Sequence, residues 1–136
     1  MSEPPGSSLH RSVPAIPQAV TALRRAAGQF ATGLGAGDSV VDGVRLAVSE
    51  AVTNVILHAY PDREEPGPVE LTAALDGAEL LVTVRDEGMG MSPRIDSPGL
   101  GLGLPLVGRI ATRVDITAPV GGGTLVSMFF SLGPRG

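Results

Sequence analysis

The sequence predicts an α+β domain in which helices pack on one face of a mixed, mainly antiparallel sheet, giving a two-layer α/β sandwich. Three observations predict this fold: two consecutive helical patterns in the N-terminal half, an alternating hairpin in the middle, and two short alternating segments near the C-terminus. The 136 residues suffice for one domain with a buried core. We expect a flexible tail over residues 1–8 and a single domain over residues 9–133.

The two helical patterns follow each other closely. Apolar residues recur at helical spacing over residues 16–34, and a cluster of glycines ends this pattern. Asp38 or Ser39 offers an N-cap for a second helix, which runs to about Tyr60 and is ended by Pro61.

Alternating apolar residues predict the strands of the sheet. The expected strands are residues 9–13, 69–75, 80–84, 113–117 and 124–132. Asp76-Gly77 is a strong signal for the turn of a hairpin between the second and third of these strands. A glycine-rich loop follows Asp86, and a third helix is expected over residues 102–110.

Composition excludes several classes of protein. The net charge is −4 and the positive charges are all arginines without a basic stretch, so the sequence lacks the electrostatic footprint of a nucleic-acid-binding protein. Without lysine, neither a P-loop NTPase nor a lysine-dependent protein kinase is possible. Without cysteine, disulfides and thiolate metal sites are excluded. We find no membrane-spanning run and no signal peptide, and expect a cytoplasmic protein.

A polar stripe marks the second helix. Glu50, Asn54 and His58 are four residues apart and therefore share one side of it. The rest of the helix is mostly apolar or small, so the stripe must face a cavity, a partner or solvent. Taken alone, the stripe is explained most simply by solvent, and His58 by a structural hydrogen bond near the helix end.

Asp86 lies at the end of an apolar strand face. Strand periodicity places it on the core side with Leu80, Val82 and Val84, where a carboxylate needs several hydrogen bonds. The glycines that follow it let the backbone approach a ligand closely, and an acceptor beside such a slot suits the exocyclic amine of adenine. The alternative is a plain turn in which Asp86 caps the backbone.

Two further glycine clusters are less specific. The alternating glycines of residues 99–104 precede the expected third helix and could free its N-terminal amides for phosphate oxygens. No strand precedes them, so they are not a dinucleotide fingerprint, and a bare glycine loop is more often structural than phosphate-binding. Gly121 to Gly123 lead into Thr124, whose hydroxyl is in phase with the inward face and could reach the same pocket as Asp86.

In order and spacing, these segments resemble the GHKL ATPase superfamily, which includes gyrase, histidine kinases and MutL, and whose fold is the Bergerat fold. AVSEAVTNVILHAY at residues 47–60 resembles the N-box, and VRDEGMG at 84–90 resembles the first glycine box. GLGLGLPLV at 99–107 resembles the second glycine box, and GGT at 122–124 the segment before the final strand. The compact length and the N-box resemble the anti-sigma factor serine kinases of bacterial partner-switching systems.

The resemblance implies roles for individual residues. Glu50 would be the general base, Asn54 would give its amide oxygen to Mg²⁺, and Asp86 would accept a hydrogen bond from adenine of ATP. Thr124 would support Asp86 through a water molecule. Arg24 would contact the sigma factor, although an ordinary exposed helix arginine is the alternative.

The glycines of the two boxes would shape the nucleotide slot and the phosphate-facing turn. They are Gly88, Gly90, Gly101 and Gly103.

The function implied by the resemblance is that of an ATP-dependent serine kinase that phosphorylates an anti-sigma factor antagonist of STAS type and sequesters a sigma factor, as a homodimer. A short lid over residues 89–100 with two prolines leaves open a nucleotide-binding partner switch without phosphotransfer. A stand-alone histidine-kinase-like ATPase domain, or a hydrolase that uses Glu50 on water, is a further alternative.

Overall fold

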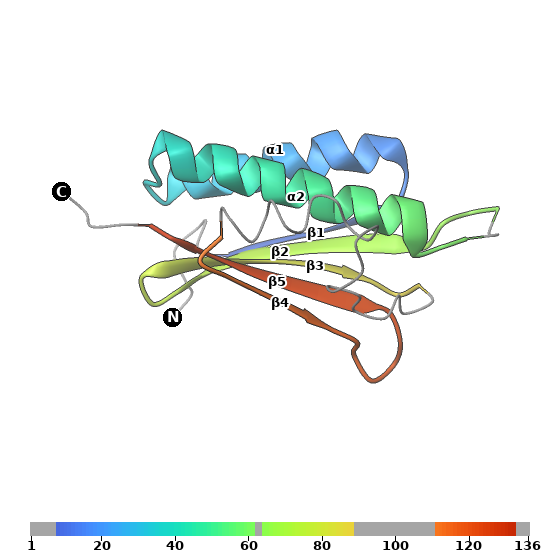
Figure 1. Cartoon of the computed structure of the whole chain (residues 1–136). Helices are drawn as coiled ribbons and strands as arrows, with labels where there is room; N and C mark the ends of the chain where they lie inside the picture. The colour runs from blue at the N-terminus through green and yellow to red at the C-terminus, as the bar shows by residue number, and fades with distance from the viewer. Residues whose placement is uncertain (1–7, 62–63, 89–110, 133–136) are drawn as a thin grey trace, which may run out of the picture.

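The computed structural model describes residues 8–61, 64–88 and 111–132. These residues form two layers, with two helices lying side by side on one face of a five-stranded sheet (Figure 1). The strand order across the sheet is β1-β2-β3-β5-β4. The predicted two-layer α+β sandwich is therefore confirmed.

The strands agree with the predicted segments, and no end differs by more than two residues. They are β1 (Ser8–Pro14), β2 (Pro68–Asp76), β3 (Glu79–Asp86), β4 (Arg113–Thr117) and β5 (Thr124–Ser131). We expected a mixed sheet, but all four pairings in the described part of the chain are antiparallel. β3 and β4 run in the same direction, but β5 lies between them and is antiparallel to both, so no parallel pair forms.

The β2–β3 hairpin turns one residue later than predicted. Asp76 pairs with Glu79, so the two-residue loop consists of Gly77 and Ala78 rather than Asp76 and Gly77. Gly77 has a φ of 67°, in the left-handed region that costs glycine little. The register of the hairpin is fixed by the position of this glycine.

The helices are α1 (Pro17–Gly33) and α2 (Asp38–His58). α1 packs above β1 and β2, and α2 packs above β3 and β5. Seen in Figure 1, α2 lies in front of α1, on the side of the sheet where β5 and β4 are found. Among the described helices, neither is long and apolar enough to span a membrane.

The N-cap of α2 differs from the prediction. Gly37 occupies it rather than Asp38 or Ser39, since the Gly37 carbonyl already accepts a hydrogen bond from the Val41 N–H at 3.0 Å. Asp38 is the first helical residue, where its carboxylate is favoured by the helix dipole. No side chain caps the start of α2, so the usual preference for a polar N-cap residue does not predict where this helix begins.

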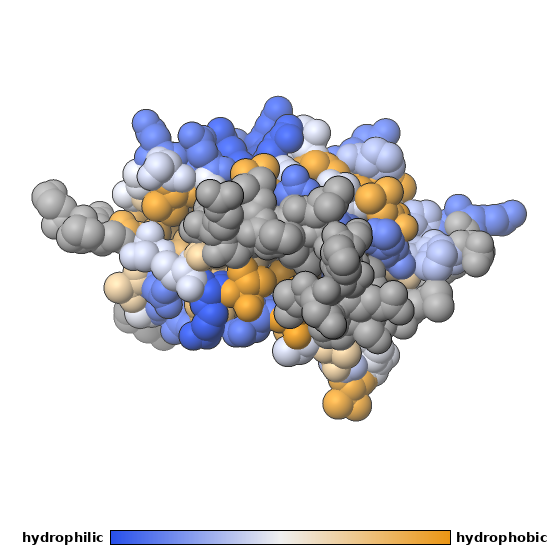
Figure 2. All heavy atoms as spheres, viewed as in Figure 1, coloured by the Kyte–Doolittle hydropathy of each residue, from blue (hydrophilic) through white to orange (hydrophobic). Residues whose placement is uncertain are grey.

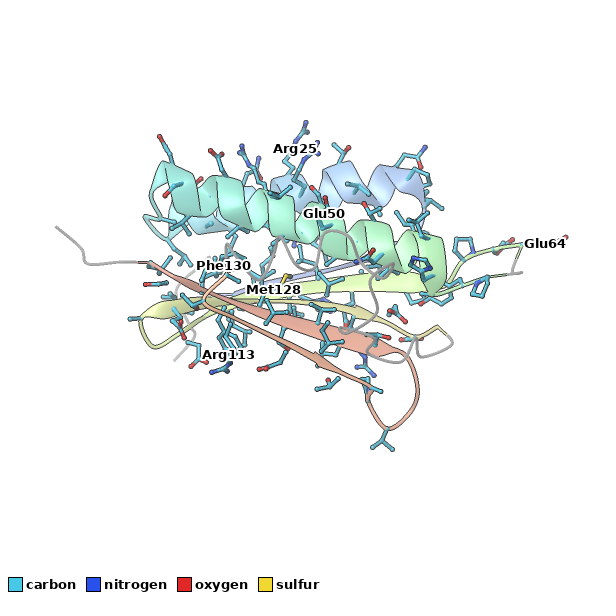
Figure 3. The ribbon with its side chains drawn as sticks, in the orientation of Figure 1. Arg25, Glu50, Glu64, Arg113, Met128 and Phe130 are labelled. Atoms are coloured by element: carbon cyan, nitrogen blue, oxygen red, sulfur yellow. The ribbon has the colours of Figure 1, made fainter. Side chains whose placement is uncertain are left out.

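The core lies between the two helices and the upper face of the sheet. Figure 3 shows Met128 and Phe130 reaching from β5 into this space. The largest fully buried side chains are Leu23, Leu71, Leu80, Met128, Val44, Val48, Val52, Val69, Val82 and Val84. They come from α1, α2 and the three central strands, as the helical and alternating patterns require.

One aromatic side chain is buried on the other face of the sheet. Phe129 alternates with Met128 and Phe130 and so points away from the helices, yet only 7% of it is exposed. The guanidinium of Arg113 on the neighbouring strand lies 3.9 Å from the centroid of its ring. This cation–π contact helps to cover Phe129 on the face of the sheet that the helices do not cover.

The third helix expected over residues 102–110 and the glycine-rich loop before it lie outside the described residues. The buried Ala111 lies two residues before the start of β4.

Leu23 provides a test of the helix–sheet core. It is 1% exposed, so we expect Leu23→Ala to lower the free energy of unfolding by about 2–5 kcal/mol, through lost burial and the cavity left behind. The matched control is Leu57→Ala, because Leu57 is 65% exposed and its truncation should change stability by less than about 0.5 kcal/mol. Urea denaturation of both variants measures the difference, and equal effects would contradict this assignment of the core.

Candidate functional site

The carboxylate of Asp86 is buried at the end of β3, as the strand pattern predicts. Only 5% of the residue is exposed. Its Oδ1 accepts a hydrogen bond from the Gly88 N–H at 2.9 Å, and the backbone of Thr124 also donates to the carboxyl group. Burial raises the pKa of Asp86 above its ordinary value of 3.8, and these two backbone hydrogen bonds oppose the rise. Asp86 therefore does cap the backbone, but at a cost in desolvation that a turn alone does not require.

Thr124 lies directly across the sheet from Asp86. The two residues are register partners in the β3–β5 ladder, and Thr124 is 4% exposed. They are the two buried polar or charged side chains among the described residues. The expectation that Thr124 reaches the same place as Asp86 is supported by this pairing.

A glycine makes the close approach of these two strands possible. Gly123 has a φ of 88°, and a Cβ at this position would lie 1.9 Å from the carbonyl oxygen of Asp86. No other residue type fits there without moving the backbone. The turn before β5 is thus built to lie against the backbone of Asp86.

The C-terminal end of α2 meets the same segment. A Cβ on Gly88 would lie 2.0 Å from the carbonyl oxygen of Ala59, so the chain after β3 packs directly on the helix end. The hydroxyl of Tyr60 accepts a hydrogen bond from the Glu87 N–H at 2.8 Å and donates one to the Pro68 carbonyl at 2.5 Å. Tyr60 therefore ties the end of α2 to the end of β3 and the start of β2.

Glu50 and Asn54 lie on α2 before this junction. Both are half-buried, whereas His58 is exposed in the last turn and its side chain forms no hydrogen bond within the described residues. At 1.5 Å per residue, Asn54 is about 8 Å and Glu50 about 14 Å along the helix from Ala59. The three positions Asp86, Asn54 and Glu50 thus form a series that begins at the buried carboxylate and extends along the helix.

The side chains on the Glu50–Asn54 flank of α2 differ from the hydroxyls near them. Those of Ser49 and Thr53 each donate to the carbonyl four residues earlier, at 2.8 and 2.7 Å. Within the described residues, the side chains of Glu50 and Asn54 make no hydrogen bond. The label in Figure 3 places Glu50 on the front of α2, over the part of the sheet that α1 does not cover. A half-buried carboxylate and amide that have no partner in the described part of the chain are suited to a ligand or metal ion.

Other predicted residues are not brought to this place. Arg24 is exposed on α1, where it lines a cavity with Arg25 and Arg45 on the outer side of the helix layer. Gly90, Gly101 and Gly103 lie outside the described residues, so their predicted roles stay predictions.

Residues 13–130 match the histidine kinase-like ATPase domain family. The chain belongs to this family. Similar curated proteins include anti-sigma F factors, and that of Clostridium acetobutylicum is 33% identical over 99 residues, which cover 65% of this chain and 68% of that protein. The resemblance to the anti-sigma factor branch of the superfamily is therefore confirmed.

Solved structures agree on the fold. The structure of the RsbU and RsbW domains of a Mycobacterium tuberculosis protein matches with a TM-score of 0.72 and 23% identity, over 91% of this chain and 32% of that one. The histidine kinase domain of a blue-light activated kinase from Erythrobacter litoralis matches with a TM-score of 0.60 and 27% identity, over 88% of this chain and 62% of that one. The Bergerat fold predicted from the sequence is the fold observed.

Tyr60 and Gly123 are the residues that sequence reasoning missed in this ATPase-like domain. The sequence pattern predicts only a helix end at Tyr60, and it includes Gly123 in an ambiguous glycine cluster without a role of its own. The only signal in the sequence was that Tyr60 is the single tyrosine of the chain and closes the segment that resembles the N-box.

The raised pKa of Asp86 predicts a pH dependence of stability. The folded state holds the Asp86 proton more tightly than the unfolded state, so this residue contributes stability below pH 3.8 that is lost as the pH rises through the raised pKa. In Asp86→Asn this contribution is absent. The free energy of unfolding of the native protein minus that of Asp86→Asn should therefore fall as the pH is raised from 3.8 toward neutrality, as measured by urea denaturation. A difference that rises with pH would mean that the backbone hydrogen bonds outweigh burial.

Gly123 and Gly121 form a matched pair for testing the turn before β5. Gly123→Ala places a Cβ against the Asp86 carbonyl at positive φ, and we expect a loss of at least about 1–3 kcal/mol of unfolding free energy. Gly121→Ala meets nothing within 4 Å and should stay within about 0.5 kcal/mol of the native protein. Thermal unfolding followed by circular dichroism measures both, and equal stability of the two variants would rule out the close approach.

Proposed function

We propose that this domain binds ATP with Mg²⁺ and transfers the γ-phosphoryl group to a serine of a protein antagonist, while its own surface holds a sigma factor. The single observation that carries the proposal is the series formed by the buried Asp86 and by Glu50 and Asn54 on one flank of α2, whose side chains have no hydrogen-bond partner among the described residues. Membership of the histidine kinase-like ATPase domain family supports it.

Asp86 would recognise adenine. A carboxylate offers about four lone-pair positions, and the two backbone hydrogen bonds leave room for a donor from the ligand. The exocyclic amine of adenine is such a donor, and Thr124 would support it from the neighbouring strand. Gly88 and Gly90 would form the floor of the slot, because glycine permits close approach.

Asn54 and Glu50 would act at the phosphate end. Asn54 would hold Mg²⁺ through its amide oxygen, and the ion would offset the negative charge of the phosphates. Glu50 would take the proton from the serine hydroxyl while the serine oxygen bonds to the γ-phosphorus. The bond between the γ-phosphorus and the bridging oxygen would break, and ADP would leave. Gly101 and Gly103 would turn their backbone amides toward the phosphates.

The partners are proposed from the relatives. The relative from Clostridium acetobutylicum is named an anti-sigma F factor, and the Mycobacterium tuberculosis structure contains an RsbW domain. A sigma factor and a STAS-type antagonist are the partners we propose for this chain. Arg24, exposed on α1, is the proposed contact for the sigma factor.

Glu50→Gln separates phosphotransfer from nucleotide binding. It keeps the size of the side chain but removes the base, so we expect serine labelling from ATP to fall by at least about 100-fold while ATP affinity is unchanged. Asp86→Asn should instead weaken ATP binding by about 10-fold or more, because an amide NH₂ then faces the adenine amine. Labelling of an antagonist protein with γ-³²P-ATP and calorimetry with a non-hydrolysable analogue measure the two effects.

The outcomes distinguish the proposed kinase from its alternatives. If the native protein binds ATP and releases its partner but labels no serine, and Glu50→Gln does the same, the domain is a nucleotide-dependent switch without phosphotransfer. Phosphate released to water would indicate a hydrolase. If no nucleotide binds the folded protein with Mg²⁺ present, both the kinase and the switch are wrong.

A further inference from the structure

Three arginines converge on the outer side of the helix layer. Arg24 and Arg25 of α1 and Arg45 of α2 line a cavity of about 230 Å³ together with Thr21. Figure 3 shows Arg25 extending from α1 away from the sheet, and the upper surface in Figure 2 is largely hydrophilic. This arginine cavity lies on the flank of α2 that faces α1, so it is separate from the Glu50–Asn54 flank.

The arginines of the cavity form no ion pair within the described residues. The two ion pairs in the described part of the chain join His10 to Glu70 and Arg113 to Asp115, and both lie on the sheet, away from the cavity. No hydrogen bond or ion pair from the guanidinium groups of the cavity is found in the described part of the chain. Three neighbouring cations repel one another, and this arrangement stands out in a chain whose net charge is −4.

Gly28 sets the position of Arg45. A Cβ at Gly28 would lie 2.4 Å from Nε of Arg45 and 3.0 Å from its Cγ, so the arginine side chain lies directly across the bare backbone of α1. Gly28 is buried beneath it. A glycine inside a helix is unfavourable by about 1 kcal/mol relative to alanine. The presence of glycine at position 28 in spite of this cost indicates that the space beside it is needed for the Arg45 side chain.

We propose that the arginine cavity binds a phosphate group. The three guanidinium groups offer hydrogen-bond donors and no acceptors, and the hydroxyl of Thr21 can also donate. Such donors bind oxyanions, and the planar guanidinium group makes bidentate contacts with phosphate. A phosphate carries a charge of about −1.5 to −2 at neutral pH, whereas one carboxylate carries −1 and would leave most of the repulsion in place. The site does not depend on the proposed kinase activity. Because Arg24 lines it, a bound phosphate group would compete with a sigma factor that uses Arg24.

NMR titration of the full chain with inorganic phosphate at constant ionic strength tests the proposal. The Nε–Hε signals of Arg25 and Arg45 should shift with a common dissociation constant, while that of Arg11 on the edge strand should not move. Arg25→Gln should weaken this binding by about tenfold or more, because it removes one charged donor. Arg11→Gln changes the net charge equally and should leave the dissociation constant unchanged.

Gly28→Ala is the sharper variant because it retains all three arginines. Its Cβ displaces the Arg45 side chain while the alanine favours the helix, so the protein should fold and yet bind phosphate about tenfold more weakly. Phosphate binding that is unaffected in both Arg25→Gln and Gly28→Ala would overturn the proposal, as would a response to a polyglutamate peptide with none to phosphate. The titration contains no nucleotide, so failure of the kinase proposal would leave its result unchanged.

Discussion

A buried carboxylate at the end of β3 is the constraint on which the rest of this site depends. Taking Asp86 out of water is unfavourable, and the structure offsets the cost with backbone donors from Gly88 and from Thr124. Those donors exist only because two glycines, Gly88 and Gly123, let the backbone come closer than any side chain would allow. A fold that needed only a turn after β3 could have used a solvent-exposed polar residue, with none of these demands.

The end of α2 is held to the same point by Tyr60. Its hydroxyl bonds to the backbone at both Glu87 and Pro68, so the helix that carries Glu50 and Asn54 cannot shift relative to β3 without breaking these two hydrogen bonds. A rigid helix then transmits this anchor along its length. The separation between the adenine-binding and phosphate-binding residues of the proposed site is therefore set by helix geometry rather than by a loop.

Much of this arrangement could be predicted from the sequence, because it follows from periodicity. Helical spacing located both described helices, and alternation located the strands and put Asp86 on the buried face. The features that were missed depend on contacts between distant segments: Tyr60 against Glu87, Arg113 over Phe129, and Gly28 beneath Arg45. The N-cap at Gly37 and the one-residue shift of the hairpin loop were missed because residue preferences define ends only approximately. The glycines at 90, 101 and 103 stay predictions.

The two flanks of α2 show how one helix can serve two different surfaces. Its valines and alanines fix one side against the sheet, which leaves two narrow flanks for polar groups. The hydroxyls of Ser49 and Thr53 donate to carbonyls of the helix itself, and on the flank toward α1 Arg45 crosses Gly28. On the other flank Glu50 and Asn54 have no such bonds within the described residues. A half-buried polar group without a hydrogen-bond partner is unfavourable, because it has lost water and gained nothing in exchange. A ligand that supplies the missing partners would offset this cost.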